Sequence, residues 1–130
     1  MRRVRRPRED GFVTVQFTVA TALTLVLVTV VAQLVVHQYA RGVVRAALDE
    51  GVRAGSRAGP DGAARCDEAV TRTLSDLLGG TLGDRIDVAP CTEGPDVIEA
   101  AAVADLPSWT PLTPGWRFEV RASAVRERDP

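Results

Sequence analysis

Residues 11–36 read GFVTVQFTVATALTLVLVTVVAQLVV, a run without a single charged side chain. From Phe12 to Val36 the run holds nine Val, four Leu and two Phe. As an α-helix these roughly 25 residues would be about 37 Å long, against about 30 Å for the hydrocarbon core of a bilayer. The apolar side chains would favour insertion by on the order of 6 kcal/mol before the Thr and Gln residues subtract their share. The stretch therefore predicts a membrane-spanning helix, assigned to residues 12–39.

A cleaved secretory signal is the main alternative interpretation of this stretch. The apolar region of such a signal is usually only about 7–15 residues long and ends at a cleavage site of small residues. Here the apolar run is longer, and the helical pattern continues through residues 37–40 (HQYA) without a turn. A retained membrane helix is therefore the expected form.

The charges on the two sides of the predicted span indicate its orientation. Five arginines lie among the first eight residues, at Arg2, Arg3, Arg5, Arg6 and Arg8. Four more follow the span at wider spacing, at Arg41, Arg45, Arg53 and Arg57. By the positive-inside rule the denser N-terminal group favours a cytoplasmic N-terminus and an extracytoplasmic C-terminal domain. We expect residues 1–11 to be a basic cytoplasmic leader beside membrane lipid, and no nucleic-acid partner, because no room remains for a nucleic-acid-binding fold.

Beyond the span, residues 40–59 are predicted to extend the same helix. Its apolar positions recur at spacings of three and four and form one narrow stripe: Ala40, Val44, Ala47, Leu48, Gly51, Val52 and Gly55. The turn cluster GPDG at residues 59–62 predicts that the helix ends near Ala58. Three glycines repeat every fourth residue, at Gly51, Gly55 and Gly59. This spacing lets two helices approach closely, although small residues also accumulate where a helix frays.

Residues 60–130 are predicted to form a small α+β domain. Gly62–Leu78 has the apolar spacing of a helix, which Gly79 and Gly80 close. Arg85–Ala89 alternates as a strand, and Trp116–Val125 is the clearest strand of the chain. Val97–Leu106 fits a strand or a helix, and we expect a strand because a hairpin requires one. The expected fold is a long N-terminal helix followed by a helix and antiparallel strands.

Both cysteines, Cys66 and Cys91, follow the apolar helix. If this part lies outside the cytoplasm, a disulfide is their natural use. A bridge between them would close a loop of about 26 residues and contribute roughly 3–4 kcal/mol to a domain with few large apolar side chains. Two free buried thiols are the alternative. A zinc site is not expected, because His37 is the only histidine and further ligands are missing nearby.

The sequence offers little that predicts catalysis. His37 has no neighbouring Ser or Cys, and the carboxylates are scattered singly or in pairs that fit a solvated face. The stretch GGTLG at residues 79–83 lacks the Lys that follows in a phosphate-binding loop. Trp109 and Trp116 bracket a loop and fit a binding patch, although packing in the core or at a membrane interface is more common. No enzymatic activity, cofactor or metal is expected.

Residues 9–17 (EDGFVTVQF) resemble the processing site of type IV pilin-like proteins. The shared features are a short basic leader, a Gly, a hydrophobic first mature residue and a polar residue at the fifth mature position. The continuation VVHQYARGVVRAALDEGVRAGSRAG at residues 35–59 is similar to the actinobacterial TadE-like pseudopilins of the tight-adherence (Flp pilus) system. The resemblance covers residues 9–59, and beyond them only the small size and the two cysteines agree.

The resemblance implies that a prepilin peptidase cuts between Gly11 and Phe12. The fifth mature residue of pilins is usually Glu, whose carboxylate compensates the new α-amino group of a neighbouring subunit, because an unpaired buried ion is costly. Here the position is Gln16, which accepts a hydrogen bond but neutralises no charge. Gln16 at the inner headgroup boundary, without a role in assembly, is the alternative.

The expected function is that of a minor pseudopilin, which packs through its helix against other pilin-like or tight-adherence components in a pilus or secretion assembly. Two alternatives remain. One is a membrane-tethered extracytoplasmic binding module that uses the Trp-containing loop, and the other is a small subunit of another cell-envelope complex that retains its leader.

Overall fold

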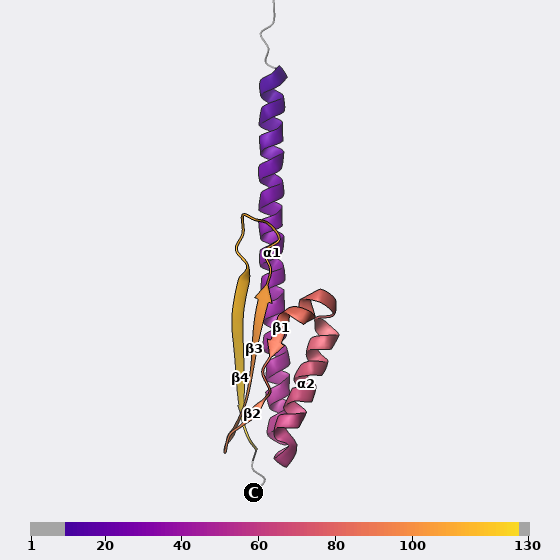
Figure 1. Cartoon of the computed structure of the whole chain (residues 1–130), viewed down its shortest axis with the longest axis vertical. Coiled ribbons are helices and arrows are strands. Elements are labelled where there is room, and N and C mark those ends of the chain that lie inside the picture. The colour runs from indigo at the N-terminus through magenta and orange to yellow at the C-terminus, as the bar shows by residue number, and fades with distance from the viewer. Residues whose placement is uncertain (1–9, 128–130) are drawn as a thin grey trace, which may run out of the picture. The chain divides into compact units, whose positions relative to one another are not determined.

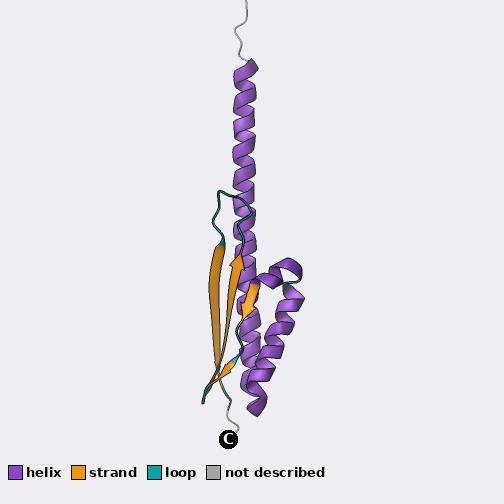
Figure 2. Cartoon of the chain, viewed as in Figure 1, coloured by secondary structure: helices purple, strands orange, loops and turns teal. Residues whose placement is uncertain are grey.

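The computed structural model describes residues 10–127 and has the predicted α+β class (Figures 1 and 2). Its elements are helices α1 (Asp10–Arg57) and α2 (Gly62–Leu77), and strands β1 (Ile86–Val88), β2 (Thr92–Glu93), β3 (Val97–Leu106) and β4 (Trp116–Val125). Short 3-10 turns, Gly59–Asp61 and Gly80–Arg85, precede α2 and β1. The chain divides between Leu34 and Val35 into two compact units. The predicted leader, apart from its last two residues, lies outside the described residues.

Helix α1 ends at Arg57, one residue before the predicted end. The backbone N–H of Ala58 donates a hydrogen bond to the carbonyl of Gly55 (3.2 Å), which closes the last turn. Gly59 follows with a φ of 64°, in the left-handed region that glycine enters without a steric penalty. Pro60 then cannot continue the α-helical hydrogen-bond pattern. The GPDG cluster therefore stops the helix as its composition predicts.

The apolar stripe predicted on residues 40–59 is buried in the second unit. All seven of its residues have buried side chains or backbones: Ala40, Val44, Ala47, Leu48, Gly51, Val52 and Gly55. Val44 and Leu48 are fully buried and share one hydrophobic core with Val70 of α2 and Ile98 of β3. The helix extension and the domain that follows it are thus one folded unit, and the predicted boundary between residues 59 and 60 does not divide compact units.

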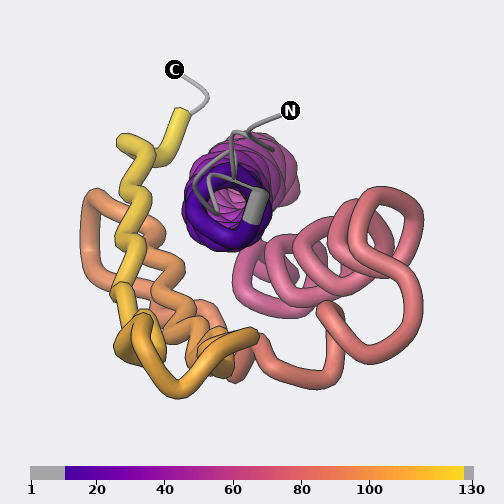
Figure 3. Tube along the Cα trace, turned by 90° about the horizontal axis from the view of Figure 1, so that it is seen from above, coloured from indigo at the N-terminus to yellow at the C-terminus, as the bar shows by residue number. Residues whose placement is uncertain are grey.

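The sheet is antiparallel and is built around β3. Strand β4 pairs with β3 along its full length, from Val97↔Val125 to Leu106↔Trp116, and β1 and β2 pair with the other edge of β3. Seen along α1, the sheet and α2 lie on different sides of the part of α1 that belongs to this unit (Figure 3). The buried residues of β3 alternate along the strand: Ile98, Ala100, Ala102, Ala104 and Leu106. This alternation confirms the strand at residues 97–106, and β2 is a short strand that the sequence did not indicate.

Candidate functional site

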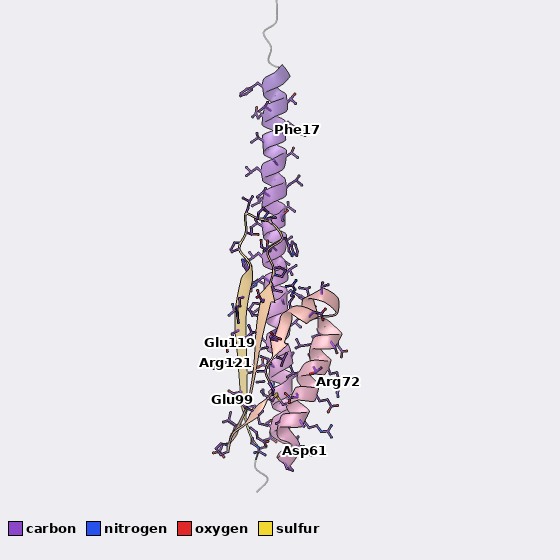
Figure 4. All side chains as sticks on the ribbon, in the orientation of Figure 1. Phe17, Asp61, Arg72, Glu99, Glu119 and Arg121 are labelled. Atoms are coloured by element: carbon purple, nitrogen blue, oxygen red, sulfur yellow. A yellow bond between two sulfur atoms is a disulfide. The ribbon has the colours of Figure 1, made fainter. Side chains whose placement is uncertain are left out.

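Residues 11–28 of the first unit present an apolar helical surface on every side. Each residue from Gly11 to Val28 is exposed, and Phe12 is 74% exposed. Successive residues of an α-helix turn by about 100°, so the exposed Val, Leu and Phe side chains point in all directions around the axis. Figure 4 shows these side chains, with Phe17 labelled, projecting from the helix. The described chain therefore does not itself cover its most apolar segment.

Helix α1 is long and apolar enough to cross a membrane, judged by its length and composition. A core helix of a soluble protein or a signal sequence meets the same criterion. Only 6% of the most apolar window of α1 is buried, however, which is unlike a core helix. The described residues therefore leave this apolar segment exposed instead of burying it in a core.

The hydroxyl groups of the apolar segment are compatible with an apolar environment. Thr18 donates to the carbonyl of Thr14 (2.9 Å), Thr24 to that of Ala20 (2.8 Å) and Thr29 to that of Leu25 (2.9 Å). Each hydroxyl is thereby satisfied within its own helix. Burial of these threonines in lipid or against another helix would not leave the donors unpaired, which is otherwise the main cost of a polar group in an apolar medium.

The predicted processing residues Gly11, Phe12 and Gln16 all lie in the first turns of α1 and are exposed. A Cβ atom at Gly11 would meet no atom within 4 Å, so the described structure places no packing demand on this glycine. The structure thus keeps the residues accessible, and whether they are processed stays a prediction.

Two of the three spaced glycines bring α1 against α2 of the same chain. A Cβ atom at Gly51 would lie 2.2 Å from Cγ2 of Val70, and one at Gly55 would lie 2.7 Å from the carbonyl oxygen of Gly62. Gly59 differs, because a Cβ atom there would meet nothing within 4 Å and the residue serves the turn after α1. Within the described residues Gly59 packs against no helix, and a helix-packing role for it stays a prediction. The face with Gly51 and Gly55 is occupied by α2 and is not free for another subunit.

This close approach predicts opposite effects of the same substitution at two glycines. Gly55→Ala places a methyl group against the backbone of Gly62, which has no flexible side chain that can move away, and is expected to cost about 1–3 kcal/mol. Gly42→Ala is the matched control, since Gly42 is an exposed glycine of the same helix with nothing within 4 Å of its Cβ position. It is expected to stabilise by about 0.5–1 kcal/mol. Denaturant unfolding of the full chain in detergent measures the free energy of unfolding of both variants. Equal changes in the two variants would contradict the packing argument.

The predicted disulfide between Cys66 and Cys91 is present, with the two Cα atoms 6.2 Å apart. It joins α2 to the segment between β1 and β2. Next to the bridge, the backbone N–H of Cys91 donates to Oδ1 of Asp67 (2.7 Å). Asp67 was expected on a solvated face, but its carboxylate instead fixes the backbone beside the cross-link.

The lone histidine takes part in an aromatic cluster of the second unit. The His37 ring contacts Trp116 edge to face with centroids 4.3 Å apart, and Phe118 in the same way at 5.1 Å. Trp116 therefore packs within the fold, whereas Trp109 remains 53% exposed. The two tryptophans that bracket the loop thus differ in role, which sequence spacing alone did not distinguish.

The charged groups form pairs that suit a surface. Glu68 accepts from Arg65 (3.2 Å) and Arg72 (2.7 Å) on α2, and Arg121 donates to Glu119 (2.6 Å) on β4. Arg72, Glu119 and Arg121 are labelled in Figure 4.

Within residues 10–127 no group of three or more His, Cys, Asp or Glu side chains is arranged to hold a metal ion. A hollow of about 250 Å³ beside β3 and β4 is lined mainly by small residues and also by Glu99 and Arg121.

The exposed apolar surface of residues 11–28 is accordingly the candidate functional site of the described chain. It has no ionisable group, and its chemistry is that of burial against lipid or other apolar helices. Comparisons with protein-family models, with curated proteins and with solved structures found no match to this chain.

Proposed function

We propose that this chain is a single-pass membrane protein of the TadE-like pseudopilin type, which acts by helix packing in a pilus or secretion assembly. The observation that supports it most is the dual character of α1. Its N-terminal part is apolar and exposed, and the same helix continues through Leu34 and Val35 into the core of a disulfide-bonded α+β unit. Burial of apolar surface contributes roughly 25 cal/mol per Å². Lipid supplies this burial first, and neighbouring helices of an assembly supply it afterwards.

The two parts of α1 differ in which surface is already covered, and this difference supports assembly through the first unit. In the second unit the small-residue face of α1 is covered by α2, so Gly51 and Gly55 are used within the chain. The apolar surface left for other subunits is that of residues 11–28. The proposed orientation has the N-terminus in the cytoplasm and the disulfide outside, where oxidising conditions maintain it.

The proposed place in the assembly is a minor or initiating one. The fifth residue after the proposed cut is Gln16, whose amide cannot neutralise the α-amino group of a neighbouring subunit. A filament made of many such subunits would bury one uncompensated charge for each copy. A component present in one or a few copies incurs this cost only at its own position.

Processing is the sharpest test of the proposal. In native membranes with the prepilin peptidase, N-terminal sequencing and intact mass of the extracted protein are expected to show Phe12 as the first residue. Gly11→Val is expected to retain the leader, because a branched side chain replaces the glycine next to the proposed cut. The variant should fold normally, since nothing lies within 4 Å of the Cβ position.

Gly42→Val is the control, because Gly42 is equally open but remote from the proposed cut. It should mature as the wild type does. A wild-type protein that begins at Met1 or Arg2, or a Gly11→Val variant of unchanged mature size, would refute processing and favour a cell-envelope protein that keeps its leader.

A further inference from the structure

The β3–β4 loop, residues 107–115 (PSWTPLTPG), is free of charge in a chain in which 25% of the residues are charged. Its two large apolar side chains point into solvent, with Trp109 53% and Leu112 77% exposed. Single exposed apolar residues are common on protein surfaces. A Trp and a Leu that are exposed together on an uncharged loop are less common, and they indicate a surface that contacts an apolar partner.

The loop holds its own shape through its small polar side chains. The Ser108 hydroxyl shares a hydrogen bond with the Thr113 hydroxyl (2.8 Å), which also lies 2.9 Å from the Thr110 hydroxyl. The backbone N–H of Thr113 donates to the carbonyl of Thr110 (3.3 Å). The polar groups are thus turned toward one another inside the loop. Trp109 and Leu112 are not needed for this network and stay available for a partner.

The loop lies at the end of the second unit where α1 enters it. Leu106↔Trp116 is the last pair of the β3–β4 ladder before the loop, and the Trp116 ring lies against His37. His37 is the third residue of this unit and follows Val36, where the uncharged run ends. Tyr39 is exposed at the same end, and its hydroxyl lies 3.4 Å from the carbonyl of Leu77, to which it donates.

The opposite end of the unit is charged. Arg126 forms an ion pair with Glu93 (2.8 Å) and donates to the carbonyl of Gly59 (2.9 Å). Asp61 lies at this end, as Figure 4 shows, whereas the β3–β4 loop is at the other end of the sheet in Figure 1. The unit therefore has a charged end, and an uncharged loop at the end from which the apolar helix departs.

We propose that the loop at residues 107–115 docks on the lipid surface, with Trp109 and Leu112 inserted between headgroups and acyl chains. This inference rests on the membrane span proposed above. Trp suits this depth because its ring is apolar while its N–H group reaches the polar headgroups. A loop without charges enters the interface without removing an ion from water. The loop is then a second membrane contact of the chain, in addition to α1.

The test uses the full chain reconstituted in phosphatidylcholine vesicles. The chain has two tryptophans, so Trp116→Phe isolates the emission of Trp109 and retains a ring against His37. Lipids brominated near the headgroups are expected to cause a larger loss of Trp109 emission than lipids brominated near the bilayer centre. Aqueous iodide is expected to quench this tryptophan weakly.

Two charge substitutions in the Trp116→Phe background provide the matched comparison. Leu112→Asp puts a carboxylate on the loop and is expected to abolish the bromolipid quenching and to restore quenching by iodide. Val125→Asp adds the same charge at an equally exposed residue at the opposite end of the ladder, and is expected to change neither.

The outcomes separate the docking from the span. If the protein resists alkaline carbonate extraction while Trp109 is open to iodide and untouched by bromolipids, the docking is overturned and the span stands. If the protein does not stay with the vesicles, both are overturned. Shielding of Trp109 in native membranes but not in pure lipid would overturn lipid docking in favour of a protein partner.

Discussion

Two arginines in the middle of the apolar helix are expected to release the protein from membranes. Leu25→Arg/Val28→Arg places both charges on one face of α1, where both wild-type side chains are exposed. Each arginine at the centre of a span opposes insertion by about 2.5–3.5 kcal/mol. The pair therefore costs about 5–7 kcal/mol, which offsets the whole gain of on the order of 6 kcal/mol from the Val, Leu and Phe residues.

The measurement is the fraction of protein that remains in the pellet after alkaline carbonate extraction. Ala46→Arg/Glu50→Arg is the control, because it puts two arginines on exposed positions of the same helix in the second unit. It is expected to behave as the wild type. Extraction of the wild-type protein, or retention of the Leu25→Arg/Val28→Arg variant, would show that the apolar segment does not reside in lipid.

Loss of the disulfide is expected to have the largest effect on the folded unit. Cys66 and Cys91 are buried and 25 residues apart in sequence, and Cys66→Ala/Cys91→Ala frees this loop in the unfolded chain. The expected loss is about 3–4 kcal/mol from chain entropy. For a domain of this size that lowers the midpoint of thermal unfolding by roughly 10–30 °C. Emission of Trp116, whose ring packs on His37, reports unfolding of this unit.

Reductant provides the control within the same experiment. The wild-type protein should fall to the midpoint of the Cys66→Ala/Cys91→Ala variant when reduced, and the variant itself should not respond. A wild-type midpoint that reductant leaves unchanged would mean that the bridge does not stabilise the unit, and that the core of Leu48, Val70 and Ile98 suffices.

The elements with strong local signals could be predicted from the sequence. The GPDG cluster marked the end of α1 because Gly59 takes a left-handed φ and Pro60 cannot extend a helix. Trp116–Val125 alternates apolar and charged residues, and this pattern reports a half-buried strand. Val97–Leu106 was ambiguous because alanine fits either element, and the strand follows from its pairing with β4. Strand β2 has only two residues and leaves no periodic signal.

Some features of the candidate site could likewise be predicted from the sequence, and others could not. The apolar character of residues 11–34 follows directly from the absence of charge over the run, whereas only the structure shows that residues 11–28 are exposed. The separate roles of Trp109 and Trp116 could not be predicted from the sequence, because only the fold shows that Trp116 packs against His37. The carboxylate of Asp67, bonded to the backbone of Cys91, likewise depends on a contact between residues 24 positions apart.

The sequence by itself determined where this chain is apolar: one segment on every side of the helix, and one narrow stripe along residues 40–59. Only the tertiary structure decided what covers each part. The stripe with Gly51 and Gly55 is buried by α2 and the sheet of the same chain, while residues 11–28 stay uncovered. The physical reason is that periodicity encodes which face must leave water, whereas the surface that receives it is set by contacts distant in sequence.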